Sequence, residues 1–422
     1  MKTFSVCTLG CKVNAYDAAA MRALFLQRGY AEVEFEEPAD IALIVTCTVT
    51  AVADKKSRAM IRRAARTAKV IVAGCLAQRG AAELLTMEGV DAVVGTDGRS
   101  HVVEVAERLL SGEEKLDATH DIAGCGYEPL RVTDTGAHTR GVLKVQEGCD
   151  NFCSYCIIPY VRGRSRSRAL AEIISEGETL VEGGAKELVL TGIHVAAYED
   201  GGHDIADVIR ALDGLGTRIR LGSLEPDRFS HDFVKRIASV NSFCPHFHIS
   251  LQSGSDTVLK RMARRYTAAE YLAFLRELRA HFELPGITTD VIAGFPGETE
   301  EEHRETLDFV QECGFSRLHV FPFSPRKGTR AYDMTPRVDK ATAKHRASEL
   351  IALGEALETD YLRSLAGHQD EVLFEENSAT YPGCAEGYSR RYVRVAAQAA
   401  PGEMRTVTLA SAKQSVLYGE EK

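Results

Sequence analysis

The sequence predicts an α/β protein with an N-terminal doubly wound parallel sheet, a central incomplete barrel of six β/α units and a small C-terminal β-barrel. Short β-branched apolar runs alternate with helical stretches through the N-terminal quarter of the chain, an order typical of a parallel sheet. A second such series follows a stretch that lacks periodicity. After Gly367 the pattern changes to short strand-like runs separated by Gly and Pro, which is typical of a small β-barrel.

The N-terminal domain is predicted to span residues 1–112. Its buried strands are expected at 4–8, 41–46, 70–73 and 92–94, because these runs are apolar without alternation. Its helices are expected at 15–28, 52–68, 78–87 and 100–110. Gly, Asp, Thr and Glu then replace the periodic pattern, so residues 113–136 are predicted to be a linker.

The second domain is predicted to span residues 137–366. Its strands are expected at 141–145, 187–190, 218–221, 247–251, 287–292 and 317–321. Six units fit an incomplete barrel, because a complete one has eight units and usually needs about 250 residues. A long helical pattern at 341–365 closes this domain, and residues 367–422 form the predicted β-barrel, with strand-like runs at 371–374, 392–395 and 406–409.

Composition limits the class of protein. The 422 residues carry a formal net charge of −9, which argues against a generally basic nucleic-acid binder but leaves local basic patches open. No apolar run reaches the roughly 18 residues of a membrane span, and the N-terminus lacks the apolar stretch of a signal peptide. We therefore expect a cytoplasmic protein with no membrane partner, whose eleven cysteines are free, metal-bound or catalytic.

Three cysteines, Cys149, Cys153 and Cys156, have the spacing C-x3-C-x2-C directly after the first strand of the second series. That position is a loop at the C-terminal mouth of the barrel, where such folds keep their chemistry. Three thiolates can hold three irons of a [4Fe–4S] cluster and leave the fourth iron open. The alternative is a zinc knuckle, which needs a fourth ligand, and Cys125 is the only nearby candidate.

A second set consists of Cys11, Cys47 and Cys75. Each follows a predicted parallel strand and precedes a helix, so the three loops share one edge of the sheet. Cysteines of an ordinary core more often lie inside strands, as Cys7 does. The pattern predicts a second three-cysteine [4Fe–4S] cluster, again with an open iron.

The motif at Cys149–Cys156 resembles that of the radical S-adenosylmethionine (SAM) superfamily. The resemblance implies that the open iron chelates the amino and carboxylate groups of SAM. It also implies that SAM is lined by the aromatic residue before the third cysteine, a glycine-rich segment and the ends of two further strands. The matching residues are Tyr155, Gly183, Gly184, Glu187, Ser223, Glu225 and Ile292.

The two cysteine sets in this order resemble the methylthiotransferases, over nearly the whole chain. The family has an N-terminal cluster domain, a radical SAM core and a C-terminal TRAM-type β-barrel. The supporting strings are residues 8–14, 46–50, 74–78, 148–163, 251–255, 294–299 and 321–329. The chain departs from the family at Val45 and Leu76, where Asn and an aromatic residue are common. Four cysteines match nothing in the family pattern and are interpreted as structural: Cys125, Cys244, Cys313 and Cys384.

The strings at 10–14, 153–159 and 321–329 look most like the branch that acts on N6-threonylcarbamoyladenosine at tRNA position 37. This implies methylthiolation of adenine C2 by a SAM-derived 5′-deoxyadenosyl radical, with sulfur carried by the second, auxiliary cluster. The implied partners are tRNA, an electron donor such as a flavodoxin or ferredoxin, and a sulfur donor; no catalytic side chain beyond the cluster cysteines is assigned. Alternatives are the branch that modifies a ribosomal-protein aspartate, another radical SAM enzyme with an auxiliary cluster, and a non-enzymatic metal-containing RNA-binding protein.

Local basic groups are candidates for phosphate contacts. One helical stretch carries Lys55, Lys56, Arg58, Arg62, Arg63, Arg66 and Lys69, although it could equally be a solvated helix face. The predicted RNA contacts next to the cluster motif are Arg162, Arg164, Arg166 and Arg168. The predicted RNA contacts in the C-terminal barrel are Arg390, Arg391 and Arg394, interleaved with Tyr388 and Tyr392, which could equally be core residues.

Overall fold

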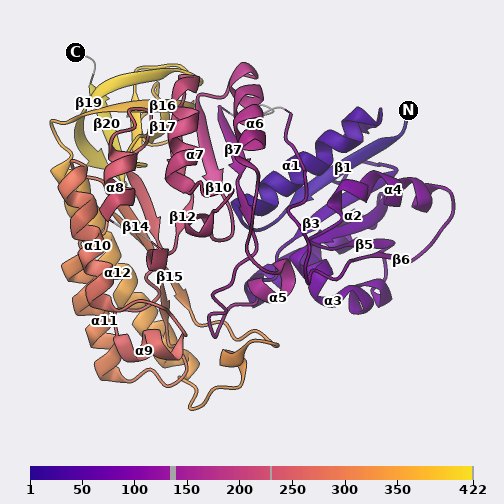
Figure 1. Ribbon diagram of the computed structural model, residues 1–422, viewed down its shortest axis with the longest axis horizontal. Coiled ribbons are helices and arrows are strands. Elements are labelled where there is room, and N and C mark those ends of the chain that lie inside the picture. Colours follow the sequence, from indigo (N-terminus) through magenta and orange to yellow (C-terminus); the bar gives the residue numbers. More distant parts are fainter. Residues whose placement is uncertain (134–138, 229–230, 421–422) are drawn as a thin grey trace.

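The N-terminal domain is a six-stranded parallel sheet in the computed structural model, which describes residues 1–133, 139–228 and 231–420 (Figure 1). Its strand order is β2-β1-β3-β4-β5-β6. The strands are β1 (Thr3–Thr8), β2 (Ala31–Glu32), β3 (Ile41–Thr46), β4 (Lys69–Gly74), β5 (Ala92–Val94) and β6 (Leu116–Ala118). The helices are α1 (Lys12–Gln27), α2 (Ala51–Ala64), α3 (Cys75–Thr86) and α4 (Val102–Leu110), the last preceded by the 3-10 turn η1 (Arg99–His101).

Alternate residues of β3 explain why helices cover both faces of this sheet. Ile41 and Leu43 pack with α1 and α4, whereas Ala42 and Ile44 pack with α2 and α3. A strand buried on both faces reads as a continuous apolar run, which is why the sequence identified it. The short edge strands β2 and β6 were not predicted, and β6 falls within the expected linker, because two or three residues carry no periodic signal.

The central domain is a half-barrel of parallel strands. Its strands are β7 (Arg140–Lys144), β10 (Glu187–Thr191), β11 (Arg218–Leu221), β12 (Ser223–Leu224), β13 (His246–Ile249), β14 (Gly286–Ala293) and β15 (Arg317–Pro322). Because β11 and β12 are separated by Gly222 alone, they act as one strand, and the expected six strands are confirmed. β8 (Gln146–Glu147) and β9 (Arg166–Ser167) form a short antiparallel pair beside the barrel.

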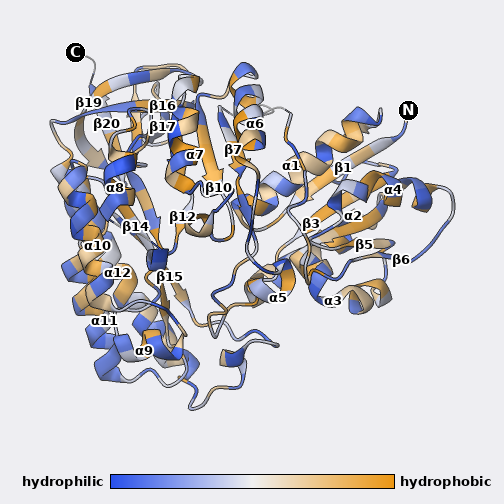
Figure 2. Cartoon of the chain, in the orientation of Figure 1, coloured by the Kyte–Doolittle hydropathy of each residue, from blue (hydrophilic) through white to orange (hydrophobic). Residues whose placement is uncertain are grey.

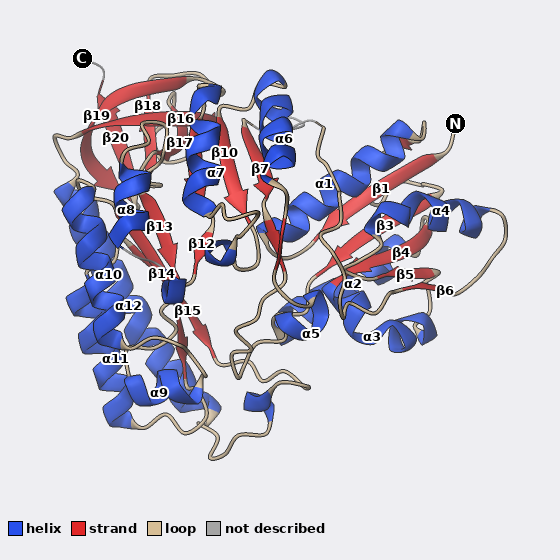
Figure 3. Cartoon of the chain, viewed as in Figure 1, coloured by secondary structure: helices blue, strands red, loops and turns tan. Residues whose placement is uncertain are grey.

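Helices cover the outer face of the half-barrel (Figures 1 and 3). They are α6 (Leu170–Glu182), α7 (Ile205–Leu212), α8 (His231–Ala238), α10 (Ala268–His281), α11 (Glu300–Cys313) and α12 (Lys340–Ser364). Two short helices, α5 (Ile158–Arg162) and α9 (Asp256–Arg261), follow strand ends. The 3-10 turns are η2 (Val195–Ala197), η3 (Asp213–Leu215), η4 (Pro226–Arg228) and η5 (Arg330–Tyr332).

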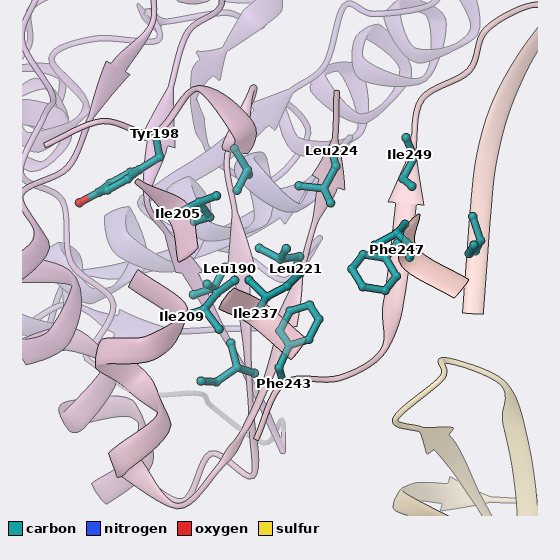
Figure 4. Close-up of a cluster of buried hydrophobic side chains, with 14 of the residues drawn as sticks. Leu190, Tyr198, Ile205, Ile209, Leu221, Leu224, Ile237, Phe243, Phe247 and Ile249 are labelled. Carbon is teal, nitrogen blue, oxygen red and sulfur yellow. The ribbon is translucent and has the colours of Figure 1, made fainter. Parts of the chain in front are cut away.

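The core of the half-barrel lies between the strands and these helices. Leu190 of β10 and Leu221 of β11 pack against Ile205 and Ile209 of α7 and Ile237 of α8, all of them buried (Figure 4). The helices turn hydrophilic residues outward (Figure 2). This packing holds the strand ends in place, and the loops beyond them form the site.

The C-terminal domain is a closed barrel with strand order β16-β17-β18-β20-β19. Its strands are β16 (Gln369–Asn377), β17 (Ala385–Ser389), β18 (Arg394–Ala397), β19 (Met404–Lys413) and β20 (Val416–Glu420). It packs on the N-terminal ends of the half-barrel strands, where a Cβ on Gly286 would lie 2.1 Å from the carbonyl oxygen of Arg391. In the described part of the chain, no helix is both long enough and apolar enough to span a membrane.

Candidate active site

The first cysteine set lies in the loop that follows β8, at the C-terminal end of the half-barrel strands. Gly148 starts the loop with a φ of +72°, and a Cβ there would lie 1.9 Å from the carbonyl oxygen of Arg164, so no larger residue fits. Burial raises the pKa of the Cys149 thiol to about 12, and the neighbouring Cys153 adds to this shift. Cys156 in turn interacts electrostatically with both of these thiols. Three converging thiols that keep their protons at neutral pH unless a metal replaces them fit three ligands of an iron–sulfur cluster.

Charged side chains touch the sulfurs of this first set. Arg264 Nη1 lies 3.3 Å from Cys153 Sγ, and the same guanidinium pairs with Glu225. His194 Nδ1 lies 3.8 Å from Cys149 Sγ, and His194 Nε2 lies 3.5 Å from Asp227. A guanidinium donor such as that of Arg264 stabilises negative charge on sulfur and tunes cluster potentials. Of these four residues, Glu225 was expected near SAM from its place after a strand, whereas Arg264, His194 and Asp227 were not predicted.

The second set is brought together by three adjacent strands. Cys11, Cys47 and Cys75 follow β1, β3 and β4, which neighbour one another in the sheet. A Cβ on Gly10 would lie 2.7 Å from Cys47 Cβ, so the first two loops are in contact. Asn14 ties them by donating to the carbonyl oxygens of Leu9 at 2.7 Å and Thr46 at 2.9 Å. The three thiols interact electrostatically, and burial raises the pKa of Cys75 to about 11.

Helix α5 joins the two cysteine sets. Cys75 packs against Ile157 and Val161, and Ile157 directly follows Cys156 in the chain. Arg162, at the end of α5, donates from Nε to Cys75 Sγ at 3.2 Å. Arg162 is the sixth residue after Cys156, and the five residues 158–162 form α5. The segment that follows the first set thus contacts Cys75 of the second set, through Ile157, Val161 and Arg162.

A buried network of charges surrounds Arg162 where the N-terminal domain meets the half-barrel. Three carboxylates, Asp17, Glu128 and Glu147, pair with three cations, Arg99, Lys144 and Arg162. Burial alone would raise the pKa of Glu147, but Arg162, Lys144 and Arg99 hold it well below its usual range. Because the network balances, each member is needed; removing one partner of a buried pair costs about 3–5 kcal/mol.

Two of the predicted RNA contacts are buried inside the protein, and two more are half-buried and bound by backbone carbonyls. Arg162 is fully buried in this network, and Arg168 is fully buried against Glu176 at 2.5 Å. Arg390 donates to the carbonyl oxygens of Asn241 and Phe243, and Arg391 to those of Glu283 and Leu284. Arg162, Arg390 and Arg391 bind segments that are distant in the sequence, whereas Arg168 binds Glu176 on the neighbouring helix α6. Charge patterning along the sequence does not reveal such partners.

The other predicted RNA contacts are more accessible. Arg164 is 70% exposed, pairs with Asp150 at 3.2 Å and lies over the ring of Phe152. Arg166 is half-buried and donates to the carbonyl oxygens of Arg162 and Arg164. Arg394 pairs with Glu386 and lines the interior of the half-barrel.

Four of the residues expected to line SAM lie at the C-terminal ends of the strands. Tyr155 and Ile292 pack into one apolar cluster around Phe295, and Glu225 pairs with Arg264 beside Cys153. The Ser223 hydroxyl faces the interior of the half-barrel.

The expectation for Gly183, Gly184 and Glu187 is wrong. Gly183 and Gly184 end helix α6 before β10 begins, so they lie at the opposite end of the strands from the cysteine loop. Glu187 is fully buried there, bound by Arg218 at 2.6 Å and Arg220 at 2.8 Å. Residues before a parallel strand lie at one edge and residues after it at the other. The segment after β10 that does line the interior is Thr191–Ile193, which the sequence analysis did not single out.

Glu187→Gln is expected to destabilise the protein in a pH-dependent way. Burial raises the pKa of Glu187, but Arg220 and Arg218 outweigh it and lower the value to about 2 from an ordinary 4.5. The shift corresponds to about 3 kcal/mol of stability, present above pH 4.5 and lost as the pH falls towards 2. Urea unfolding at pH 7 should show a loss of at least this size, shrinking below pH 4.5. Glu113→Gln, in an exposed pair with Arg108, is the control and should change little.

The interior of the half-barrel is a cavity of about 790 Å³ that opens beside the second cysteine set. It is lined by residues of all three domains: Gly10–Val13 and Val49, the strand residues Ser223, His246, His248, Asp290, Arg317 and His319, and Tyr388, Tyr392 and Arg394 of the C-terminal barrel. Cys11 is exposed to this space, whereas Cys47 and Cys75 are buried. A nucleoside-sized ligand in the cavity would therefore meet Cys11.

Comparison with known proteins matches both cysteine-bearing domains. Residues 143–310 match the Radical SAM superfamily and residues 3–95 match Uncharacterized protein family UPF0004. The threonylcarbamoyladenosine tRNA methylthiotransferase MtaB of Bacillus subtilis is 41% identical over 94% of this chain and 90% of its own length. The tRNA-2-methylthio-N(6)-dimethylallyladenosine synthase of Desulfosudis oleivorans is 35% identical, over 90% and 84%. The solved radical S-adenosylmethionine methyltransferase TsrM from Kitasatospora setae shares the fold, with a TM-score of 0.59 at 15% identity over 79% of this chain and 77% of that one.

A half-barrel of parallel strands with a three-cysteine loop at its C-terminal mouth defines a radical SAM enzyme, a class that uses SAM and a [4Fe–4S] cluster. Relatives above 30% identity that align over most of both chains narrow the class further. The chain belongs to the methylthiotransferase family of radical SAM enzymes, and the family expected from its cysteine motifs is thereby confirmed.

Proposed function

We propose that this protein methylthiolates C2 of N6-threonylcarbamoyladenosine at position 37 of tRNA. The observation that carries the proposal is the pair of cysteine sets on either side of α5, the second of which opens on a cavity large enough for a nucleoside. Relatives that act on threonylcarbamoyladenosine and on dimethylallyladenosine, by their names, both align over most of the chain. The former include the relative with 41% identity, which supports the threonylcarbamoyl substrate.

The proposal requires two [4Fe–4S] clusters, one on Cys149, Cys153 and Cys156 and an auxiliary one on Cys11, Cys47 and Cys75. When bound, SAM and these clusters supply the radical chemistry and the sulfur that no side chain of the protein can provide. An electron donor such as a flavodoxin or ferredoxin, and a sulfur donor, are further expected partners.

The protein's own residues position and insulate these groups. Tyr155, Ile292, Ser223 and Glu225 are proposed to line SAM, since they gather at the strand ends beside the first set. Arg264 and Arg162 each donate to one cysteine sulfur and stabilise its negative charge. Tyr388, Tyr392 and Arg394 of the C-terminal barrel line one end of the cavity and are proposed to limit the access of water there.

The test is the nucleoside content of tRNA from cells that lack the gene. Mass spectrometry should show loss of the 2-methylthio group from threonylcarbamoyladenosine, with the unmethylthiolated nucleoside accumulating. Restoration by the wild-type gene, and not by a gene with Cys149, Cys153 and Cys156 replaced, completes the experiment. Loss confined to dimethylallyladenosine derivatives would assign the enzyme to the other tRNA substrate, and intact tRNA with an unmodified ribosomal-protein aspartate would assign it to the protein substrate.

Helix α2 is the basic surface that best fits tRNA. It begins four residues after Cys47, where Thr50 caps it by accepting from the backbone N–H of Ala53 at 3.1 Å. Lys55, Lys56 and Arg62 on this helix are exposed. Because α2 starts two residues after Val49, which lines the cavity, these cations are proposed to contact phosphates near the target nucleotide.

Replacing Lys55, Lys56 and Arg62 by Gln is expected to weaken tRNA binding. Each lost phosphate contact should reduce the slope of log affinity against log salt by about 0.7–0.9, or about 2 in total. Titration of labelled tRNA at several salt concentrations measures both quantities. The matched control replaces Arg210, Lys235 and Arg276, which lie on the outer helices α7, α8 and α10. Equal slopes for the two triple variants would remove α2 from the RNA-binding surface.

A further inference from the structure

The cavity contains a lysine whose ammonium has no polar partner in the described part of the chain. Lys12 directly follows Cys11 and lines the cavity, and within the described residues its ammonium makes neither an ion pair nor a hydrogen bond. The other two Lys/Arg residues of the lining have carboxylates: Arg394 pairs with Glu386, and Arg317 lies 4.0 Å from Glu358. The lining acid Asp290 is matched by His248 at 3.4 Å. Lys12 is therefore the unmatched positive charge of the cavity lining.

A buried histidine of the same cavity, His246, has no hydrogen-bond partner in the described part of the chain. His246 is 4% exposed and lines the same cavity, yet neither of its ring nitrogens has a hydrogen-bond partner among the described residues. Burial and the neighbouring Arg220 hold the pKa of His246 well below its usual range, so the ring is neutral and offers one donor and one acceptor. Buried polar groups are nearly always hydrogen-bonded, so this pair of free nitrogens points to a ligand.

Tyr392 of the C-terminal domain brings these two groups together. His246 stacks on its ring with centroids 4.5 Å apart, and Lys12 Nζ lies 5.9 Å from the ring centroid. Tyr388 stacks on the same ring at 4.5 Å, and Arg220 lies 4.8 Å from its centroid. The Tyr392 ring is thus packed on several sides. Both the Lys12 ammonium and the His246 imidazole contact this ring. A surface formed by an ammonium and a neutral imidazole favours a ligand group that is anionic and has further hydrogen-bonding atoms. It does not favour an apolar ligand group.

We propose that Lys12 and His246 form a subsite for the carboxylate of an amino-acid substituent on N6 of the target adenosine. This inference rests on the proposed function and names how that site selects its substrate. A threonylcarbamoyl group carries a carboxylate and a hydroxyl, whereas a dimethylallyl group carries neither. Since Lys12 is the neighbour of Cys11, binding the substituent here holds the adenine beside the second cysteine set. Lys12 and His246 act as specificity-determining residues and take no part in bond making or breaking.

The first test changes the ligand and leaves the protein intact. Anticodon stem-loop RNAs are prepared with threonylcarbamoyladenosine, with its methyl ester, or with dimethylallyladenosine at position 37, and their affinities for the anaerobic holoenzyme are measured by fluorescence anisotropy. The acid should bind at least about ten-fold more tightly than the ester or the dimethylallyl RNA, because a charge-assisted hydrogen bond is lost in both. Equal affinity of the acid and the ester overturns the proposal.

The second test changes the protein. Lys12→Met should reduce the preference for acid over ester to near unity, while Lys12→Arg, which keeps the charge, should retain a preference. His246→Phe, which keeps the stack on Tyr392, should reduce the preference in part. Lys235→Met on the outer helix α8 is the control and should behave as wild type. A full preference in Lys12→Met at wild-type iron content overturns the assignment; if its iron content falls, the Lys12→Arg and His246→Phe results decide.

Different results would contradict the proposed function and the carboxylate subsite. If tRNA from cells without the gene keeps its 2-methylthio-threonylcarbamoyladenosine, the proposed function fails. If that nucleoside is lost but the holoenzyme binds the acid and the ester equally, only the carboxylate subsite fails.

Discussion

Replacing Cys149, Cys153 and Cys156 together by Ala is expected to abolish SAM cleavage and to halve the iron content. If both cysteine sets hold [4Fe–4S] clusters, the anaerobic holoenzyme carries about eight irons per chain, and the variant should keep about four. The loop is held by neighbours that the substitutions leave in place, such as Gly148 against Arg164 and the pair of Arg264 with Glu225. Chemical iron analysis and chromatographic detection of 5′-deoxyadenosine after reduction measure the two effects.

The control for this triple variant is Cys125→Ala, a half-buried cysteine outside both sets. It should retain full iron and full SAM cleavage. If the triple variant also retained full iron, the cysteines would not be ligands; if it lost all iron, the two sets would depend on one another.

The convergence of the cysteines could be predicted because it depends on strand direction and on the adjacency of the three strands. Cys11, Cys47 and Cys75 follow parallel strands, and the carboxyl ends of parallel strands share one edge, whatever the register. The same rule contradicts the prediction that Glu187 lines SAM. Glu187 is the first residue of its strand, so it lies at the opposite edge of the sheet, where it pairs with Arg218 and Arg220. Strand direction thus explains both why the cysteines converge and why Glu187 lies far from them.

The roles of the arginines could not be assigned from the sequence, because a basic residue type does not reveal which groups its side chain contacts in the fold. Arg162 meets Asp17 from 145 positions away, and Arg390 meets Asn241 from 149 positions away. Arg162 and Arg164 are two residues apart in one basic run, yet the first is fully buried and the second is 70% exposed. Arg162 is buried because acidic residues of other segments pair with it in the folded protein. Periodicity and composition do not reveal such tertiary contacts.

Replacing Cys11, Cys47 and Cys75 together by Ala is expected to separate two activities. SAM cleavage should continue, since Cys149, Cys153, Cys156 and the residues around them are unchanged, whereas methylthiolation of tRNA should fall below detection. About four irons per chain should remain. Measuring 5′-deoxyadenosine and the methylthiolated nucleoside in the same reaction shows both effects at once.

The outcome of this separation depends on Arg162, which donates to Cys75 and also closes the charge network with Glu147 and Asp17. Truncating Cys75 removes only the sulfur contact, so all six ion-paired groups of the network keep their partners and the half-barrel should stay folded. A second variant, Cys75→Ser, keeps a hydrogen-bond acceptor near Arg162 while weakening iron ligation. It should reproduce the loss of methylthiolation with an unchanged unfolding midpoint in urea. If SAM cleavage were lost in both variants while iron remained on the first set, the two cysteine sets would act as one unit.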